Sequence, residues 1–296
     1  MVLEEALDSL LKPEYLRILD QLCLGDDTLA KKVFKAGEGL EATQDFVRIV
    51  LDKPELCVIE QREQEEIYDT DSMTVILDVY ARDGDGTLYD IEFQNGGVGA
   101  KALEWMKKRV RFNASKMETR NLKHGGDYAD LANVVVIVAY ERDFFGGGLP
   151  LYHVMPSVVE TGQVYDDGKS YIYINREYAC ADHGAKMRPI EKLIHDLGCV
   201  DPEQLLIPSL KARVQHLKST REGKAEMCRL MKEYGDRRAA EGIAMGEAKS
   251  DLERALNMFS DRVPFGFIQK YTGYDEQRIS AIARERGITY GATEGQ

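Results

Sequence analysis

The stretch from Met73 to Gln94 constrains this chain most, because its apolar side chains recur at every second position. Asp83-Gly84-Asp85-Gly86 interrupts it in the middle, and Gly and Asp tolerate the positive φ angles of tight turns. The pattern therefore predicts a β-hairpin in which Asp83 pairs with Thr87. In that register Asp78 lies directly opposite Glu92, with the two Cβ atoms roughly 5 Å apart.

One side of this hairpin collects acidic and amide side chains: Asp78, Asp90, Glu92 and Gln94. Two carboxylates held as close as Asp78 and Glu92 repel each other unless a cation or a proton lies between them. A hard divalent metal with oxygen ligands is the natural cation for such a pair. We therefore interpret the pair as a metal site. The alternative is a solvated hairpin face whose acids have no chemical role.

With 296 residues, 44% of them hydrophobic, the chain is long enough for one large domain or two smaller ones. It contains no apolar run long enough to span a bilayer, so we expect no membrane association. Its five cysteines are scattered, which favours reduced thiols and a cytoplasmic location. The net charge of −12 argues against indiscriminate binding of nucleic acid, although basic residues gather locally.

A strongly basic segment follows the hairpin, and its spacing predicts a helix from about Ala100 to Leu122. Apolar residues occupy one arc of the helical wheel: Leu103, Met106, Val110, Ala114 and Met117. Basic residues occupy nearly the opposite arc: Lys101, Lys108, Arg109, Lys116, Arg120 and Lys123. Because like charges repel along a helix face, this arc predicts contact with DNA phosphates. A merely solvated face is the alternative.

The rest of the chain divides into a mixed part and a helical part. Further strands are predicted at 56–60, 133–140, 149–155 and 170–174, with a charged connector after the first. Helices are predicted at 221–258, 267–271 and 276–286, and helical spacing also runs through 1–52. The composition changes near residue 200. This change predicts one domain over 1–200 and a helical C-terminal region over 201–296.

In this order, the elements resemble the core of the PD-(D/E)xK nucleases, and more closely the Rpn family of recombination-promoting nucleases and transposases. The matching residues include Leu77-Asp78-Val79, Ile91-Glu92-Phe93-Gln94, Arg109, Gly126-Asp127-Tyr128 and, in the tail, Tyr271-Thr272-Gly273. The resemblance implies an α/β restriction-endonuclease-like core, in which helices flank a mixed central sheet.

The resemblance also implies a metal-dependent DNA endonuclease that hydrolyses phosphodiester bonds and promotes recombination or transposition. Asp78, Glu92 and the backbone carbonyl of Phe93 would bind Mg²⁺ or another divalent cation such as Mn²⁺. Gln94 would orient the attacking water, at a position where the superfamily usually has lysine. The DNA backbone would be held by Lys101, Lys108, Arg109, Lys116 and Arg120.

Three features have more than one interpretation. A third carboxylate often completes such sites in this superfamily, and Glu41, Asp45 and Glu60 are the candidates. The neutral Gln94 leaves the alternative of a DNA-binding or assembly protein that keeps the nuclease fold without useful catalysis. In the tail, 268–282 predicts an ordinary helical hairpin or a small helix-turn-helix. Two glycines four residues apart in the long helix before it predict a homo-oligomer formed through the C-terminal helices.

Overall fold

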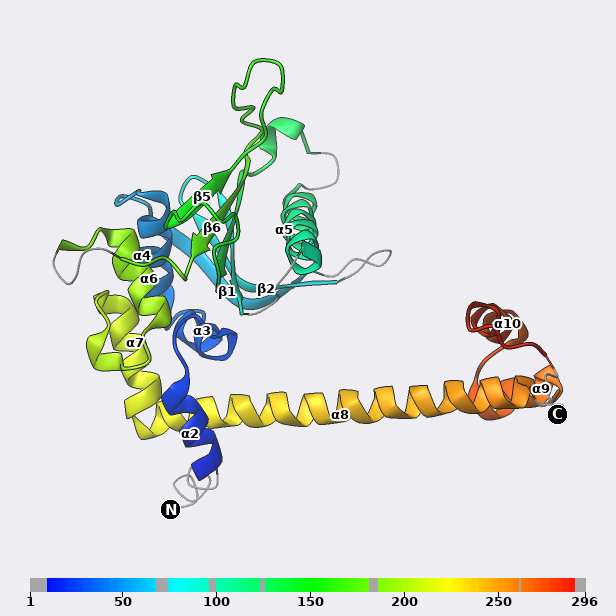
Figure 1. Ribbon diagram of the computed structural model, residues 1–296. Helices are drawn as coiled ribbons and strands as arrows, with labels where there is room; N and C mark the ends of the chain where they lie inside the picture. The colour runs from blue at the N-terminus through cyan, green and yellow to red at the C-terminus, as the bar shows by residue number, and fades with distance from the viewer. Residues whose placement is uncertain are drawn as a thin grey trace. The chain divides into compact units, whose positions relative to one another are not determined.

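The computed structural model describes residues 10–67, 74–95, 100–122, 126–180, 186–260 and 262–290. A six-stranded sheet forms the centre of the larger part of the chain, and helices cover both of its faces (Figure 1). The strands lie in the order β1-β2-β3-β4-β6-β5. The predicted α/β fold with a mixed central sheet is therefore confirmed.

Parallel and antiparallel pairs both occur in this sheet. The strands run over Val58–Ile67 (β1), Val75–Asp83 (β2), Leu88–Gln94 (β3), Val134–Tyr140 (β4), Leu151–Val154 (β5) and Lys169–Asn175 (β6). β1, β2 and β3 pair antiparallel, whereas β3, β4 and β6 pair parallel. β5 pairs antiparallel with β6 at the edge. The unbroken apolar run of β4 is almost entirely buried, as its sequence predicted.

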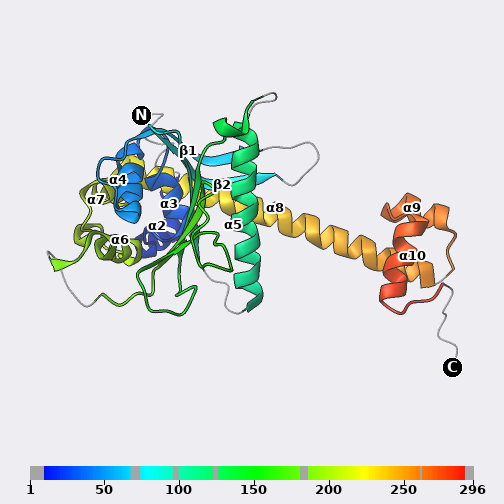
Figure 2. The same ribbon diagram turned by 90° about the horizontal axis from the view of Figure 1, so that it is seen from above.

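Helices α3 (Asp27–Val33) and α4 (Leu40–Leu51) cover one face of the sheet, and α5 (Ala100–Asn121) covers the other (Figures 1 and 2). Behind the first layer, α6 (Pro189–Gly198) and α7 (Pro208–Ser219) pack on α4. Further helices are α2 (Pro13–Gln21), α8 (Arg221–Ser260), α9 (Phe265–Thr272) and α10 (Glu276–Glu285). Because both faces of β3 are covered, its acidic side chains are buried as well as its apolar ones.

The chain forms two compact units, Met1–Leu230 and Met231–Gln296. The composition placed the boundary near residue 200, but α7 belongs to the first unit because it packs on α3 and α4. In the second unit, α9 and α10 pack with the end of α8 around Phe259, Ile268 and Ile279. Gly273, with a φ of +74°, ends α9, and α9 and α10 are the two short helices that the sequence predicted here. Among the described residues, no helix combines the length and apolarity of a membrane span.

The hairpin of β2 and β3 has the predicted register. Val79 lies opposite Ile91, and the Asp83 N–H donates to the Thr87 carbonyl at 3.1 Å. The Asp83 carboxylate stabilises the turn by accepting hydrogen bonds from the N–H groups of Asp85 and Thr87, at 3.0 and 2.9 Å. Asp78 lies directly beyond the last paired position, Val79, and the predicted direct pairing of Asp78 with Glu92 is not part of the ladder.

The strand β1 is longer than the sequence indicated, because the acidic segment predicted as a connector continues the strand to Ile67. β1 lies at the edge of the sheet, where one side of a strand can remain in solvent. Its charges are paired locally: Glu60 accepts from Arg82 on β2 at 3.0 Å. The prediction of a connector was wrong because this edge strand does not need alternating apolar residues.

Phe93 on β3 anchors the helices of one face to the sheet. Its ring centroid lies 5.4 Å from that of Phe34, at the end of α3, and 6.0 Å from that of Phe46 on α4. All three rings are buried. Side chains alternate along a strand, so Phe93 directs its two neighbours, Glu92 and Gln94, to the face covered by α5.

We predict that Phe93→Ala lowers the free energy of unfolding by about 3–5 kcal/mol, because it empties the centre of this aromatic cluster. Urea denaturation followed by circular dichroism measures the loss. Phe145→Ala is the matched control, since the Phe145 ring is 46% exposed and its removal should cost clearly less. Equal losses in the two variants would show that Phe93 does not anchor the helices.

Candidate active site

Two carboxylates, Asp90 and Glu92, lie between the sheet and α5, and a third, Asp78, lies beside them near α3. Asp78 projects from β2 and is half-buried, whereas Asp90 and Glu92 project from β3 and are 0% and 1% exposed. The Phe93 N–H donates to Asp78 Oδ2 at 3.1 Å, which holds this carboxylate against β3. The interpretation of a solvated hairpin face is therefore wrong for Asp90 and Glu92, because α5 covers them.

Two side chains of α5 hold the buried acids. Asn113 Nδ2 donates to both Asp90 Oδ2 and Glu92 Oε1, each at 3.1 Å. The Arg109 guanidinium forms an ion pair with Glu92, and its NH1 group donates to Gln94 Oε1 at 3.4 Å. Within the described part of the chain, Asp90 Oδ1 is buried and accepts no hydrogen bond. The cluster therefore has more acceptor oxygens than the protein satisfies.

The electrostatics of the cluster favour the binding of a proton or a cation. Burial raises the pKa of Asp90 to about 7. The hydrogen bond from Asn113 lowers this pKa, and the charge of Asp78 raises it further. Burial also raises the pKa of Glu92 well above its ordinary value, and the two neighbouring aspartates contribute. The pKa of Asp78 is raised by burial and by the charge of Asp27. A bound cation would relieve all three effects.

Asp27, the first residue of α3, adds an acidic group beside Asp78. Lys31 Nζ forms an ion pair with Asp27 Oδ2 at 2.8 Å. The start of α3 is tied to the end of β3, because Asn95 Nδ2 donates to Asp26 Oδ1 at 2.8 Å. Sequence reasoning did not assign Asp27 to the site. Its only local signal was its place at the start of a helix, and no spacing relates it to the hairpin.

The three candidates for a completing carboxylate lie elsewhere. Asp45 Oδ2 accepts from the Ser209 hydroxyl at 2.7 Å, Glu60 pairs with Arg82, and Glu41 is exposed on α4. Asn113 was also missed, although it is the one amide between Arg109 and Lys116 on a basic helix. Across the residues that the structure describes, no group of three His, Cys, Asp or Glu side chains is arranged to hold a metal by itself.

The predicted basic arc of α5 divides into a solvent-facing part and a sheet-facing part. Lys101 and Lys108 are exposed, whereas Lys116 is 8% exposed and Arg109 faces Glu92. Arg120 forms an ion pair with Glu65 of β1. The prediction that the basic arc lies opposite the packed face of α5 is therefore wrong for Arg109 and Lys116, because this side of α5 lies over the acidic strands. Lys123 lies outside the described residues.

The raised pKa values predict how the stability of the protein changes with pH. A carboxyl whose folded pKa is above its unfolded value binds protons more tightly in the folded state, so its contribution to stability falls as pH rises. For Asp90, the contribution to stability falls between the ordinary pKa of 3.8 and the folded pKa of about 7. At pH 8, the three acids of the cluster should therefore destabilise the metal-free protein.

We predict that Asp78→Asn raises Tm by about 2–4 °C at pH 8 in EDTA, because it removes one repelling charge and keeps an acceptor for the Phe93 N–H. The increase should shrink at pH 5, where protons already relieve the repulsion. Differential scanning calorimetry measures both values. Glu55→Gln, which changes an exposed acid, should leave Tm nearly unchanged. A lower Tm for Asp78→Asn at pH 8 would contradict this account.

Comparison with known proteins agrees with the geometry of the site. A family model of the PD-(D/E)XK nuclease family transposases matches residues 26–187, which is more than half of the chain. The matched segment contains the acidic hairpin, α5 and the whole central sheet. No curated protein and no solved structure gives a significant match. The chain therefore belongs to the PD-(D/E)XK nuclease family transposases, and its mixed sheet with flanking helices is a PD-(D/E)XK nuclease fold.

Proposed function

We propose that the protein is a metal-dependent DNA endonuclease, with Asp78, Glu92 and Gln94 as its catalytic residues. The observation that carries this proposal is the pair of carboxylates at Asp78 and Glu92, half-buried and buried respectively, with the charge of Arg109 near both. Nucleases of this family generally use divalent metal ions and act on DNA. The recombination or transposition that the family description suggests would be the process in which the cleavage takes place.

The residues of the cluster fit Mg²⁺. Their donor atoms are oxygens, the buried Asp90 Oδ1 accepts no hydrogen bond from the described residues, and the three pKa values are raised by burial. Mg²⁺ is typically bound by one or two carboxylates, together with water and substrate phosphate, so a third protein carboxylate is not required. Asp78, Glu92 and the Phe93 carbonyl would hold the ion. When bound, Mg²⁺ or Mn²⁺ polarises the scissile phosphate and lowers the pKa of a coordinated water.

The chain's own residues would perform the remaining tasks. The Gln94 amide is oriented by two hydrogen bonds, since its Oε1 accepts from Arg109 and its Nε2 donates to the Asn95 carbonyl at 3.3 Å. An amide so placed can hold a water molecule but cannot take its proton. Arg109 would stabilise negative charge on the phosphate, because its guanidinium is the cation that the acidic cluster already contacts. Asn113 would keep Glu92 in place.

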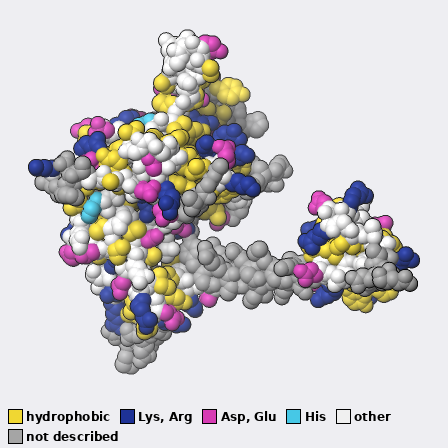
Figure 3. Space-filling model, in the orientation of Figure 1, with side chains coloured by type: hydrophobic (Ala, Val, Ile, Leu, Met, Phe, Trp, Pro, Cys, Tyr) yellow, Lys and Arg dark blue, Asp and Glu magenta, His cyan; other side chains and the backbone are white. Residues whose placement is uncertain are grey.

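The exposed basic residues of α5 would bind the DNA backbone. Lys101, Lys108 and Arg111 are exposed on this helix, and Figure 3 shows Lys and Arg side chains along the side of the first unit where α5 lies. Such contacts position DNA without reading its sequence. Arg109 and Lys116, which face the sheet, would contribute to the site and to packing instead.

The first test is cleavage of supercoiled plasmid DNA with and without Mg²⁺. We predict that Asp78→Ala slows metal-dependent nicking by roughly three orders of magnitude, because a correctly held metal contributes several kcal/mol to the transition state. Glu41→Gln, which changes an exposed acid of α4, is the control and should cleave like the parent. Full activity in a folded Asp78→Ala protein would remove Asp78 from the site.

Gln94 separates the nuclease from the alternative, a DNA-binding or assembly protein without useful catalysis. We predict that Gln94→Ala slows single-turnover cleavage by about tenfold to a hundredfold and leaves Mg²⁺ affinity unchanged, since the carboxylates remain. Gln94→Lys introduces the residue usual in the superfamily and should cleave faster than Gln94→Ala. A parent protein that binds DNA but cleaves no duplex or single strand with Mg²⁺ or Mn²⁺ would leave the alternative standing.

The role of the α5 surface is tested by the salt dependence of DNA binding. We predict that Lys101→Glu combined with Lys108→Glu weakens binding and lowers the slope of log K against log[salt] by about one per lost phosphate contact. Lys53→Glu combined with Lys186→Glu makes the same change in net charge at two exposed lysines outside α5, and it should leave the slope nearly unchanged. Equal slopes in the two double variants would show that the α5 face is only solvated.

Homo-oligomerisation through the C-terminal helices belongs to the same proposal. α8 is 40 residues long, and a helix of this length is long enough to pair with a helix of a second subunit. The two glycines that suggested helix pairing, Gly242 and Gly246, lie in a segment of α8 whose side chains the structure does not describe. All five cysteines are free thiols, which fits a reducing compartment such as the cytoplasm.

A further inference from the structure

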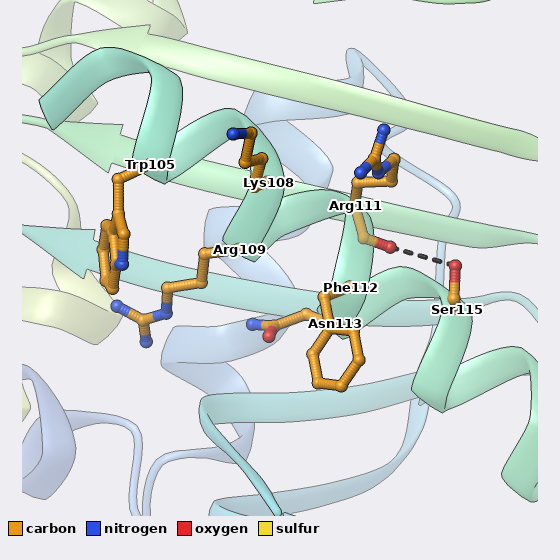
Figure 4. Close-up of a pocket in the computed structure, with 7 residues that line it drawn as sticks. All are labelled: Trp105, Lys108, Arg109, Arg111, Phe112, Asn113 and Ser115. Atoms are coloured by element: carbon orange, nitrogen blue, oxygen red, sulfur yellow. Dashed lines mark hydrogen bonds between the residues drawn. The ribbon is translucent and has the colours of Figure 1, made fainter. Parts of the chain in front are cut away.

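A cavity of about 600 Å³ lies along α5 beside the acidic cluster (Figure 4). Its lining combines two aromatic rings, Trp105 and Phe112, with the cationic groups of Lys108, Arg109 and Arg111. Its volume is within the range of cavities that bind small ligands or single residues of a larger one. Its two aromatic rings take no part in the proposed cleavage reaction.

Trp105 is the unusual residue of this cavity, because its large apolar side chain is 57% exposed on a helix of otherwise basic character. The Arg109 guanidinium lies 5.6 Å from the centre of its ring, and Lys116 Nζ lies 5.6 Å from the centre of the Phe112 ring. Both aromatic groups therefore sit beside cations. Such a lining suits a ligand that has a flat aromatic part and a negative charge.

The cavity and the candidate active site share two residues. Arg109 and Asn113 line the cavity, and the same two side chains contact Glu92, Gln94 and Asp90. A ligand in the cavity would therefore lie next to the phosphate that the acidic cluster is proposed to bind. In DNA, the group beside a phosphate is a nucleoside.

The chemistry of the lining selects an unpaired nucleoside over a paired one. In a duplex, each base is stacked on its neighbours and its face is not available to a protein side chain. Aromatic side chains stack on bases of single strands without regard to sequence, and cations follow the backbone of the same strand. A site for phosphate alone would need the lysine and arginines but not the exposed indole.

We infer that this cavity binds an unpaired nucleobase of a DNA strand, stacked on Trp105, next to the phosphate at the acidic cluster. The inference rests on the proposed action on DNA, and it names the substrate class: DNA with a single-stranded or locally opened segment. Lys108 and Arg111 hold the flanking phosphates, and Trp105 supplies the stacking surface. The protein should therefore bind a single strand in preference to the matching duplex.

The chain contains a single tryptophan, so its fluorescence reports directly on this cavity. The parent protein is titrated in EDTA, which prevents cleavage, with a single-stranded oligonucleotide, the matching duplex and an oligonucleotide of abasic sites. We expect the single strand to quench Trp105 fluorescence and the abasic backbone to bind without comparable quenching. Equal quenching by the abasic backbone, or tighter binding of the duplex without quenching by the single strand, would overturn the inference.

Variants test the same point by fluorescence anisotropy of the labelled single strand. Trp105→Ala should lower its affinity by roughly tenfold or more, and Trp105→Phe should restore most of it, because a phenyl ring still stacks. Tyr128→Ala removes another exposed aromatic side chain, 86% exposed, and should have no effect. An unchanged affinity in Trp105→Ala would overturn the inference. These binding measurements contain no metal and do not depend on cleavage. A protein that binds the single strand as expected but does not cleave DNA with Mg²⁺ would count against the nuclease proposal alone.

Discussion

The structure depends on the burial of two carboxylates, Asp90 and Glu92, beside the half-buried Asp78, with one guanidinium and one amide to hold the buried pair. Burying like charges together is unfavourable, and each removal from water raises the pKa of the acid concerned. A protein that only needed stability would place apolar residues at these positions. Perturbed acids in a covered cluster are typical of functional sites, where a ligand relieves the strain.

The position of the acidic cluster follows from the two faces of β3. Phe93 packs against Phe34 and Phe46 on the face covered by α3 and α4, so the residues on either side of it must face α5. α5 meets them with Arg109 and Asn113, which are four residues apart and therefore lie on one side of the helix. The same helix exposes cations and Trp105 to solvent, so one element serves the acids, the DNA backbone and the nucleobase cavity.

Local patterns in the sequence predicted the hairpin, its register and the buried strand β4, because alternation and turn residues are short-range signals. They did not predict that the acidic segment up to Ile67 belongs to the edge strand β1 and pairs with β2, since no apolar periodicity marks it. They also could not show that Lys116 is buried or that Asp27 lies beside Asp78. These facts depend on how α3 and α5 pack on the sheet, and that packing is a long-range property.

The central claim is that Asp78 and Glu92 form a divalent metal site, and direct binding of Mn²⁺ by isothermal titration calorimetry tests it. The account predicts binding by the parent protein at pH 8, loss of that binding in Asp78→Asn and in Glu92→Gln, and unchanged binding in Asp45→Asn, whose carboxylate contacts Ser209 instead. Equal binding in the parent and all three variants, or no binding in the parent, would contradict it.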